Sequence, residues 1–200
     1  MKAVATLALL AISLPLTLFA KGAGKTSTFA SPDGAFRFEY PSDFQLCTNG
    51  NREPCNYTFM PVCDKDAPVC VVYPSDEFKG ASFGAGFQVR ELLEYGRPPE
   101  TADACVNHKP FYVSAEHPVE QIDGVSFLHG IKAGAAMGHW DSVDYYRAFH
   151  KGKCFELSIS STGMNPDITD SQPVKTLTPA EDKRVSQTMS VILHSFRFTN

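Results

Sequence analysis

The stretch HWDSVDYYRAFHKGKCFELSIS, residues 139–160, decides the fold of this 200-residue chain. Its Lys151-Gly152 dipeptide separates two runs in which polar and apolar residues alternate. This pattern predicts two antiparallel strands joined by a two-residue turn. Such a turn places Arg147 opposite Glu156 and leaves an apolar set on the other face, which we expect to belong to the core. The set is Tyr146, Ala148, Phe155, Leu157 and Ile159.

The histidines and aspartates of this stretch disperse when residues 139–150 are treated as one strand. A strand rises about 3.3 Å per residue, so His139 and His150 lie about 36 Å apart and face opposite sides. Asp141 and Asp144 also face opposite sides. Metal ligands lie about 2 Å from their ion, so the two histidines cannot share one. We therefore expect no metal site here.

The preceding segment, residues 130–138, contains glycines that share one strand face with Lys132. If the next turn lies at Gly138-His139, Lys132 pairs with Tyr145. Glycines in a strand often mark a place where another backbone or a ligand comes close. Packing by another segment of the same chain is one explanation, and a shallow groove for a ligand or partner is the other. The candidate groove residues are Lys132, Tyr145, Arg147 and Glu156.

The Arg147–Glu156 pair has a simpler explanation within that groove. Two opposite charges across a strand pair contribute roughly 0.2–1 kcal/mol, which needs no ligand. A turn at Gly138-His139 would also place Gly130 opposite Arg147. The sequence therefore leaves open whether this face meets solvent, a partner or its own chain.

Further strands are predicted on both sides of the central stretch. Residues 36–40 alternate aromatic and charged side chains, and residues 83–89 place four apolar side chains on one face. The segment CVVYP, residues 70–74, is predicted to form a short strand. Asp123-Gly124 predicts a second tight hairpin. His129 falls on the same strand face as apolar neighbours, so we expect it on the core side.

Two helices are predicted. Thr101 can cap a short helix that contains Cys105. Thr178, Pro179 and Glu181 have the types and spacing of a helix start with a capping box. The apolar residues that follow recur at helical spacing, which predicts an amphipathic helix at the end of the domain. They are Val185, Met189, Ile192 and Phe196.

Residues 1–20 have the charged start, the short apolar run and the small final residue of a secretory signal peptide. We expect cleavage after Ala20, with Ala30 as the second candidate. Residues 21–33 are small and polar and are interpreted as a flexible lead-in. Residues 34–200 then form a single domain, and no other long apolar segment predicts a membrane span in the mature chain.

All six cysteines follow the signal segment, which predicts three disulfides in an exported protein. A zinc site is the alternative, but its ligands usually lie closer together in sequence than these cysteines do. We expect Cys105 to pair with Cys154, and the other four to pair among themselves. The other four are Cys47, Cys55, Cys63 and Cys70.

Asn56 lies in a glycosylation acceptor sequence that matters only if a eukaryote secretes the chain.

Composition and motifs exclude several functions. Without Lys2, 17 basic and 22 acidic residues remain, and no basic run predicts nucleic-acid binding. The chain lacks the G-x-S-x-G and H-E-x-x-H motifs of hydrolases. Cysteines in disulfides supply no nucleophile. The GASFGAG segment, residues 80–86, begins no predicted helix and is a weak phosphate loop.

Three segments together resemble the PsbP-like superfamily. They are AFRFEYPSDF at residues 35–44, YRAFHKGKCFELSI at 146–159 and VSQTMSVILHSFRF at 185–198. The resemblance implies an α+β fold in which an antiparallel sheet is flanked by helices as an αβα sandwich. It also implies a mostly non-catalytic role in binding partners or small ligands. The cysteine-rich segment 47–70 has no counterpart in that pattern.

These observations favour a secreted or periplasmic, non-enzymatic domain that binds a protein or a small ligand. We expect no cofactor, no metal and a monomer. A secreted hydrolase is the alternative, with Asp141, Glu156 and His139 as its best available acid–base residues. A purely structural envelope protein is the third possibility.

Overall fold

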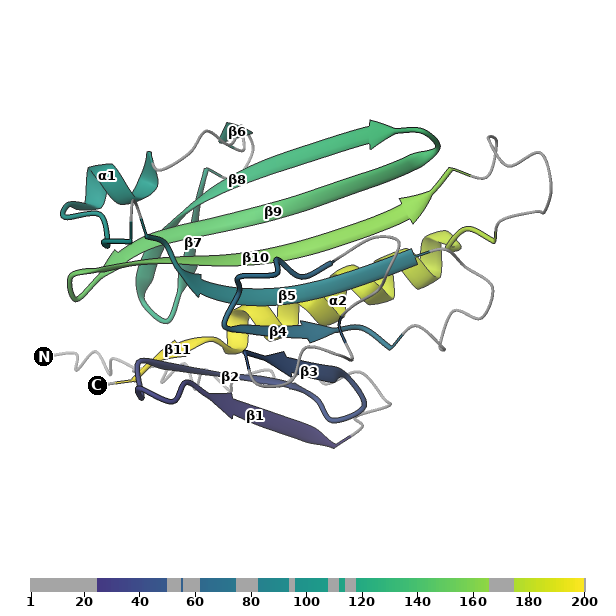
Figure 1. Cartoon of the computed structure of the whole chain (residues 1–200). Coiled ribbons are helices and arrows are strands. Elements are labelled where there is room, and N and C mark those ends of the chain that lie inside the picture. Colours follow the sequence, from purple (N-terminus) through teal and green to yellow (C-terminus); the bar gives the residue numbers. More distant parts are fainter. Residues whose placement is uncertain are drawn as a thin grey trace, which may run out of the picture.

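The computed structural model describes residues 25–49, 55, 62–74, 83–93, 96–107, 112–113, 118–165 and 175–199. These residues form two antiparallel sheets and two helices (Figure 1). The strands are β1 (Thr26–Ala30), β2 (Phe36–Pro41), β3 (Gln45–Thr48), β4 (Val69–Val72), β5 (Phe83–Glu91), β6 (Tyr112–Val113), β7 (Val119–Ile122), β8 (Val125–Ala136), β9 (His139–His150), β10 (Lys153–Met164) and β11 (Arg197–Phe198). The helices are α1 (Ala102–Val106) and α2 (Pro179–Ser195).

The large sheet has eight strands in the order β3-β4-β5-β10-β9-β8-β6, and β7 also pairs with β8. Its longest strand pair is β9–β10, which turns at Lys151-Gly152 with positive φ at both residues. The observed register places Arg147 opposite Glu156, as the two-residue turn predicts. The Asp123-Gly124 turn between β7 and β8 has the same geometry. Both hairpin predictions are confirmed.

The β8–β9 turn is displaced from its predicted place. It lies at Met137-Gly138, where both residues have positive φ, and not at Gly138-His139. Lys132 consequently pairs with Val143, whereas the prediction placed it opposite Tyr145. The register differs by two residues, so every side chain keeps its predicted face.

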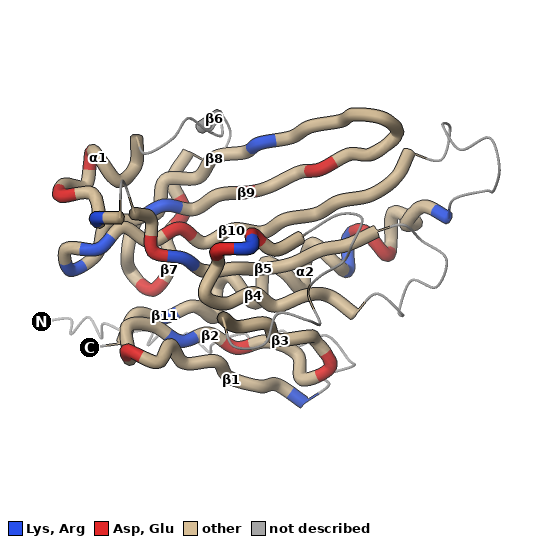
Figure 2. The backbone as a smooth tube through the Cα atoms, in the orientation of Figure 1, with Lys and Arg blue, Asp and Glu red and all other residues tan. Residues whose placement is uncertain are grey.

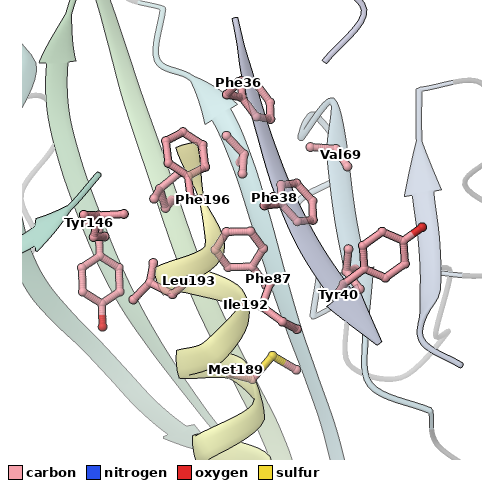
Figure 3. Close-up of a cluster of buried hydrophobic side chains, with 14 of the residues drawn as sticks. Phe36, Phe38, Tyr40, Val69, Phe87, Tyr146, Met189, Ile192, Leu193 and Phe196 are labelled. Atoms are coloured by element: carbon pink, nitrogen blue, oxygen red, sulfur yellow. The ribbon is translucent and has the colours of Figure 1, made fainter. Parts of the chain in front are cut away.

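The hydrophobic core lies between the large sheet, the small sheet and α2 (Figure 3). The small sheet has the order β1-β2-β11, and α2 contacts β2 and β5. Phe38 packs against Phe87 with ring centroids 5.1 Å apart, and Phe36 stacks on Phe196 at 5.5 Å. Burial of each such side chain contributes about 1.5–3 kcal/mol. The predicted helix residues Val185, Met189, Ile192 and Phe196 are all buried in this core.

Helix α2 begins where the sequence predicts. The Thr178 hydroxyl accepts a hydrogen bond from the backbone N–H of Glu181, and the Glu181 carboxylate accepts one from the backbone N–H of Thr178. This reciprocal pair satisfies two backbone donors that a helix start otherwise leaves free. Thr101 likewise caps α1 by accepting from the N–H of Ala104.

The interpretation of residues 21–33 as a flexible lead-in is wrong for Thr26–Ala30, which form β1. The strand pairs with β2 and places Phe29 against Phe38 at a ring distance of 5.3 Å. Exposed and half-buried positions alternate along β1, but all its residues except Phe29 are small. The sequence therefore shows no clear strand pattern there. The signal segment, residues 1–20, lies outside the described residues.

The expected αβα sandwich appears only in part. Helix α2 covers the core face of the large sheet, whereas α1 is five residues long and contacts β9 and β10 near Cys154. The described residues therefore form a mainly antiparallel β structure with two helices and do not complete a second helical layer. Neither of these helices is long and apolar enough to cross a membrane.

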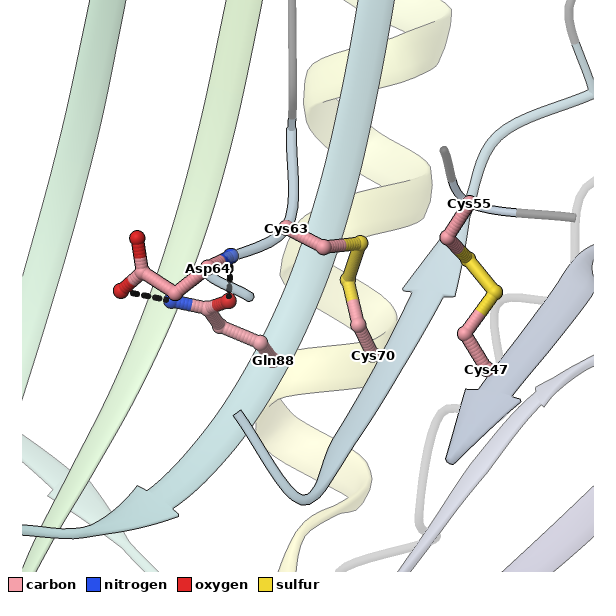
Figure 4. The surroundings of a disulfide bond; sticks show 6 residues. All are labelled: Cys47, Cys55, Cys63, Asp64, Cys70 and Gln88. Atoms are coloured by element: carbon pink, nitrogen blue, oxygen red, sulfur yellow. Dashed lines mark hydrogen bonds between the residues drawn. A yellow bond between two sulfur atoms is a disulfide. The ribbon is translucent and has the colours of Figure 1, made fainter. Parts of the chain in front are cut away.

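The structure contains three disulfides among the described residues. One joins Cys105 to Cys154 and two pair the first four cysteines locally, as predicted. Cys105–Cys154 attaches α1 to the start of β10. The local pairs fix the connection between β3 and β4 (Figure 4). They are Cys47–Cys55 and Cys63–Cys70.

The three disulfides should differ in their contribution to stability. Removal of Cys105–Cys154 by alanine substitution at both positions opens a loop of 49 residues and should lower the free energy of unfolding by about 4 kcal/mol. Removal of Cys63–Cys70, with a separation of 7 residues, should cost about 2 kcal/mol. Urea unfolding of the two double variants measures both values. Equal losses in the free energy of unfolding, or a larger loss on removal of Cys63–Cys70, would contradict this ranking.

Candidate functional site

Three of the four predicted groove residues lie together on the face of the large sheet opposite the core. Arg147 pairs with Glu156, and Tyr145 pairs with Ser158 two residues along the same strands. Alternation of side chains therefore sends Tyr145, Arg147 and Glu156 to one side, which we call the polar face. The neighbouring strand β5 adds Arg90, which pairs with Glu156.

Glu156 lies at the centre of the polar face and is completely buried. One carboxylate oxygen, Oε2, accepts a hydrogen bond from Nε of Arg147 at 2.6 Å. The other, Oε1, accepts from Nε of Arg90 at 2.7 Å and lies 2.5 Å from the Nη2 nitrogen of Arg90. Arg147 is itself only 3% exposed. Both oxygens of Glu156 are thus occupied by guanidinium groups.

Arg90 extends the network toward solvent. Its Nη1 nitrogen lies 2.8 Å from Oδ2 of Asp64, whose side chain is 49% exposed. Burial alone would lower the pKa of Arg90, but the carboxylates of Glu156 and Asp64 outweigh burial and raise it. The two arginines and two carboxylates carry a net charge of zero, so the network attracts no ion by itself.

Tyr145 lies beside the network and is a weaker acid than a free tyrosine. Burial, followed by the negative charges of Glu156 and Asp64, raises the pKa of Tyr145. Its phenol therefore keeps its proton throughout the physiological pH range. Ser158, opposite Tyr145, is buried, and within the described residues its hydroxyl forms no hydrogen bond.

A segment of the same chain covers part of the polar face. The Cγ atoms of Val62 would lie 2.8 Å from a Cβ atom at Gly84 and 3.2 Å from one at Gly86. Asp64 follows two residues later and exchanges two hydrogen bonds with Gln88 of β5, as Figure 4 shows. Gly84 and Gly86 therefore leave room for a covering segment of the same chain.

The predicted groove is therefore not one open surface. Arg147 and Glu156 are buried, whereas Lys132 is exposed and pairs with Val143, four residues along β9 from Arg147. At about 3.3 Å per residue this separation is about 13 Å. The structure brings Tyr145, Arg147 and Glu156 together and leaves Lys132 apart.

The acid–base residues proposed for a hydrolase do not meet. Asp141 pairs with Thr162 and His139 with Met164, which lie six and eight residues along β10 from Glu156. These separations correspond to about 20 and 26 Å along the strand. Since Glu156 is also held by two arginines, this assignment of Asp141, Glu156 and His139 to a catalytic site is wrong.

A histidine–carboxylate pair on the core face was missed by the sequence analysis. Nε2 of His129 lies 2.9 Å from Oδ1 of Asp144, and the His129 ring stacks on Tyr146 with centroids 4.5 Å apart. His129 is 8% exposed, so its predicted place on the core side is confirmed. Its contact with Asp144 depends on the β8–β9 register, which the predicted turn misplaced by two residues.

The remaining histidines have separate surroundings. His150 stacks on Phe198 at 4.0 Å, and Nε2 of His194 lies 3.8 Å from the carboxylate of Glu120. His108 and His117 lie outside the described residues. Within the described part of the chain, no group of three or more histidine, cysteine, aspartate or glutamate side chains is placed to hold a metal ion.

Residues 132–143, the outer half of the β8–β9 hairpin, differ from the covered centre of the sheet. We call this part the arm. Its β8 side chains are exposed from Lys132 to the turn except at Gly134, and Met137 at the turn is 96% exposed. Figure 2 shows that charged residues gather around β5 and β10, whereas the end of the arm is uncharged.

A cavity of about 370 Å³ lies at the end of the arm. Its walls come from the β8–β9 turn, from the end of β10 and from Thr176, which precedes α2. The backbone N–H of Asn165 donates to the carbonyl of Gly138 at 2.6 Å and joins the end of β10 to the turn. The lining residues are Ala135, Ala136, Met137, Gly138, His139, Trp140, Met164, Asn165 and Thr176.

The sequence matches no protein-family model and no curated protein. Several solved structures are similar to it. A protein of Bacteroides thetaiotaomicron is 11% identical with a TM-score of 0.46; the match covers 88% of this chain and 49% of that protein, so this chain spans about half its length. LpqN, involved in cell envelope biogenesis of Mycobacterium tuberculosis, is 14% identical with a TM-score of 0.44, covering 88% and 91% of the two chains.

The third structure is the PsbP protein CyanoP of Synechocystis, at 10% identity and a TM-score of 0.36, with 90% of this chain and 96% of that chain covered. A PsbP protein is therefore among the structures that resemble this chain, as the three sequence segments indicated. Similarities of this size carry no argument about function.

The charge network should stabilise the fold through Glu156. The substitution Glu156→Gln removes the counter-charge of the buried Arg147 and should lower the free energy of unfolding by about 3–5 kcal/mol. Asp64→Asn makes the same chemical change at the exposed end of the network and should cost less than about 1 kcal/mol. Urea unfolding at neutral pH measures both values. Equal losses would show that the network is not organised around Glu156.

Proposed function

We propose that this chain is an exported, non-enzymatic domain that binds a small ligand or a protein through the arm. Export is supported by the signal-like residues 1–20 and by six cysteines that are all paired, because disulfides persist in oxidising compartments.

One observation leads to the arm: its β8 side chains are exposed and its end is uncharged, although the strands continue past the covered part of the sheet. Residues 133–140 contain no Lys, Arg, Asp or Glu. Exposed edge strands usually contain charges or prolines that prevent association with other chains. An uncharged end with the exposed Met137 and a cavity is typical of a contact surface.

The polar centre of the sheet is a weaker candidate. Its carboxylate Glu156 is buried and bound by two arginines, so it offers neither a base nor a free anion to a ligand. Its role is structural in this proposal, and catalysis is not assigned to any residue.

A shortened arm tests the proposal. Replacement of residues 135–140 by Asn-Gly keeps the Gly134–Asp141 pairing and forms a tight turn there. The variant should lose cross-linked partners or ligands in the native compartment, while the thermal midpoint stays close to that of the unchanged protein because the removed side chains lie outside the main core. Cross-linking with mass spectrometry and circular dichroism measure the two properties.

The control is Ser186→Asp, a charge introduced at an exposed position of α2. It should leave the cross-linked adducts unchanged. Identical adducts from the shortened variant would exclude the arm as the binding surface. Absence of adducts from the unchanged protein would favour a purely structural envelope protein.

A further inference from the structure

The cavity at the end of the arm has a definite chemical character. We propose that it binds an uncharged, mainly apolar small molecule with a flat ring system. This inference rests on the proposed function, because it names the class of ligand that the arm takes. Its support comes from the floor of the cavity, its rim, its lack of charge and its volume.

Trp140 provides the flat surface. Its side chain lies over Gly163 of β10, where a Cβ atom would come within 2.6 Å of the indole ring. Phe83 of β5 lies beside it with ring centroids 6.3 Å apart. Gly163 thus makes room for the indole, and the ring is held against the sheet. A fixed indole favours stacking of a flat ligand ring over binding of a flexible chain.

The rim of the cavity contains two methionines, Met137 and Met164. Met137 occupies a turn position with φ of 50°, where asparagine, aspartate or glycine is preferred, and its side chain is 96% exposed. Neither the turn nor the core benefits from a methionine at this place. A flexible thioether adapts to apolar ligands of different shape, which is a use for it here.

The lining excludes an ionised ligand. Among the nine lining residues there is no Lys, Arg, Asp or Glu, so an ionised group would enter without a counter-charge. Thr176 offers a hydroxyl for one carbonyl or hydroxyl of the ligand. The volume of about 370 Å³ lies in the lower part of the range of small-molecule sites, which fits a molecule of two or three rings.

Trp140 is the only tryptophan of the chain, which makes the cavity directly observable. Energy transfer from Trp140 to bound phenylnaphthylamine, an uncharged probe with two aromatic groups, reports binding at the arm. Anilinonaphthalene sulfonate has the same aromatic frame with one added negative charge. We expect the uncharged probe to bind the purified full-length protein at least about tenfold more tightly than the sulfonate, because the charge finds no partner.

Two matched variants locate the binding. Ala135→Phe fills the cavity and should weaken binding of phenylnaphthylamine by about tenfold or more. Ala133 lies on the same face of β8, is also exposed and does not line the cavity, so Ala133→Phe should change binding less than about twofold. If Ala135→Phe fails to fold by circular dichroism, Thr176→Phe fills the cavity from the segment that precedes α2.

Several results would overturn the inference. The first is the absence of energy transfer from Trp140 to phenylnaphthylamine. The second is equal affinity for the two probes, and the third is an equal loss of binding in Ala135→Phe and Ala133→Phe. Binding that disappears on dilution together with a dimer in sedimentation would assign the cavity to a contact between two copies. If the shortened arm loses its native adducts while the probe fails to bind, the ligand class is wrong and the proposed function stands.

Discussion

The register of β9 against β10 is the constraint on which the rest of the structure depends. The Lys151-Gly152 turn sets it, and twelve residue pairs follow from it without interruption. Side chains on the two faces then separate by kind: Phe155 and Leu157 enter the core, and Glu156 enters the polar face. A slip by one residue would exchange the faces and place the Glu156 carboxylate among aromatic rings.

This register also explains why the chain needs its cysteine-rich segment. Glu156, Ser158 and Ser160 are buried although they point away from the core, so another part of the chain must exclude water from them. Val62 and Asp64 do so above β5, and Cys63–Cys70 holds them to β4. The buried carboxylate and the covering segment are therefore one structural unit, in which the disulfide limits the motion of the cover.

The sequence predicts the parts of the fold that depend on local pattern. The two turns Asp123-Gly124 and Lys151-Gly152 leave one choice of register, and both are as predicted. At the third turn, glycine at position 138 permits two choices, and the chain uses the one with Met137. Because the two choices differ by two residues, Lys132 lies on the predicted face but pairs with Val143 and not with Tyr145. The cover over the polar face has no periodicity, so neither Val62 nor its contact with Gly84 could be predicted.

Three of the four candidate groove residues therefore lie together on one face, and Lys132 lies apart from them. Arg147 and Glu156 are candidate binding residues in the sequence because they are charged. In the structure they form an ion pair with each other, so their charges compensate. Most of the cavity lining consists of alanine, glycine and methionine around Trp140, and these residue types do not indicate a binding site in a sequence. Core burial does not explain the exposed small residues at the end of the arm, because side chains that stay in water contribute little hydrophobic stabilisation. What holds its end in shape is local: the Trp140 ring on Gly163 and the bond from Asn165 to Gly138. These two contacts fix the walls of the cavity that we propose as the ligand site.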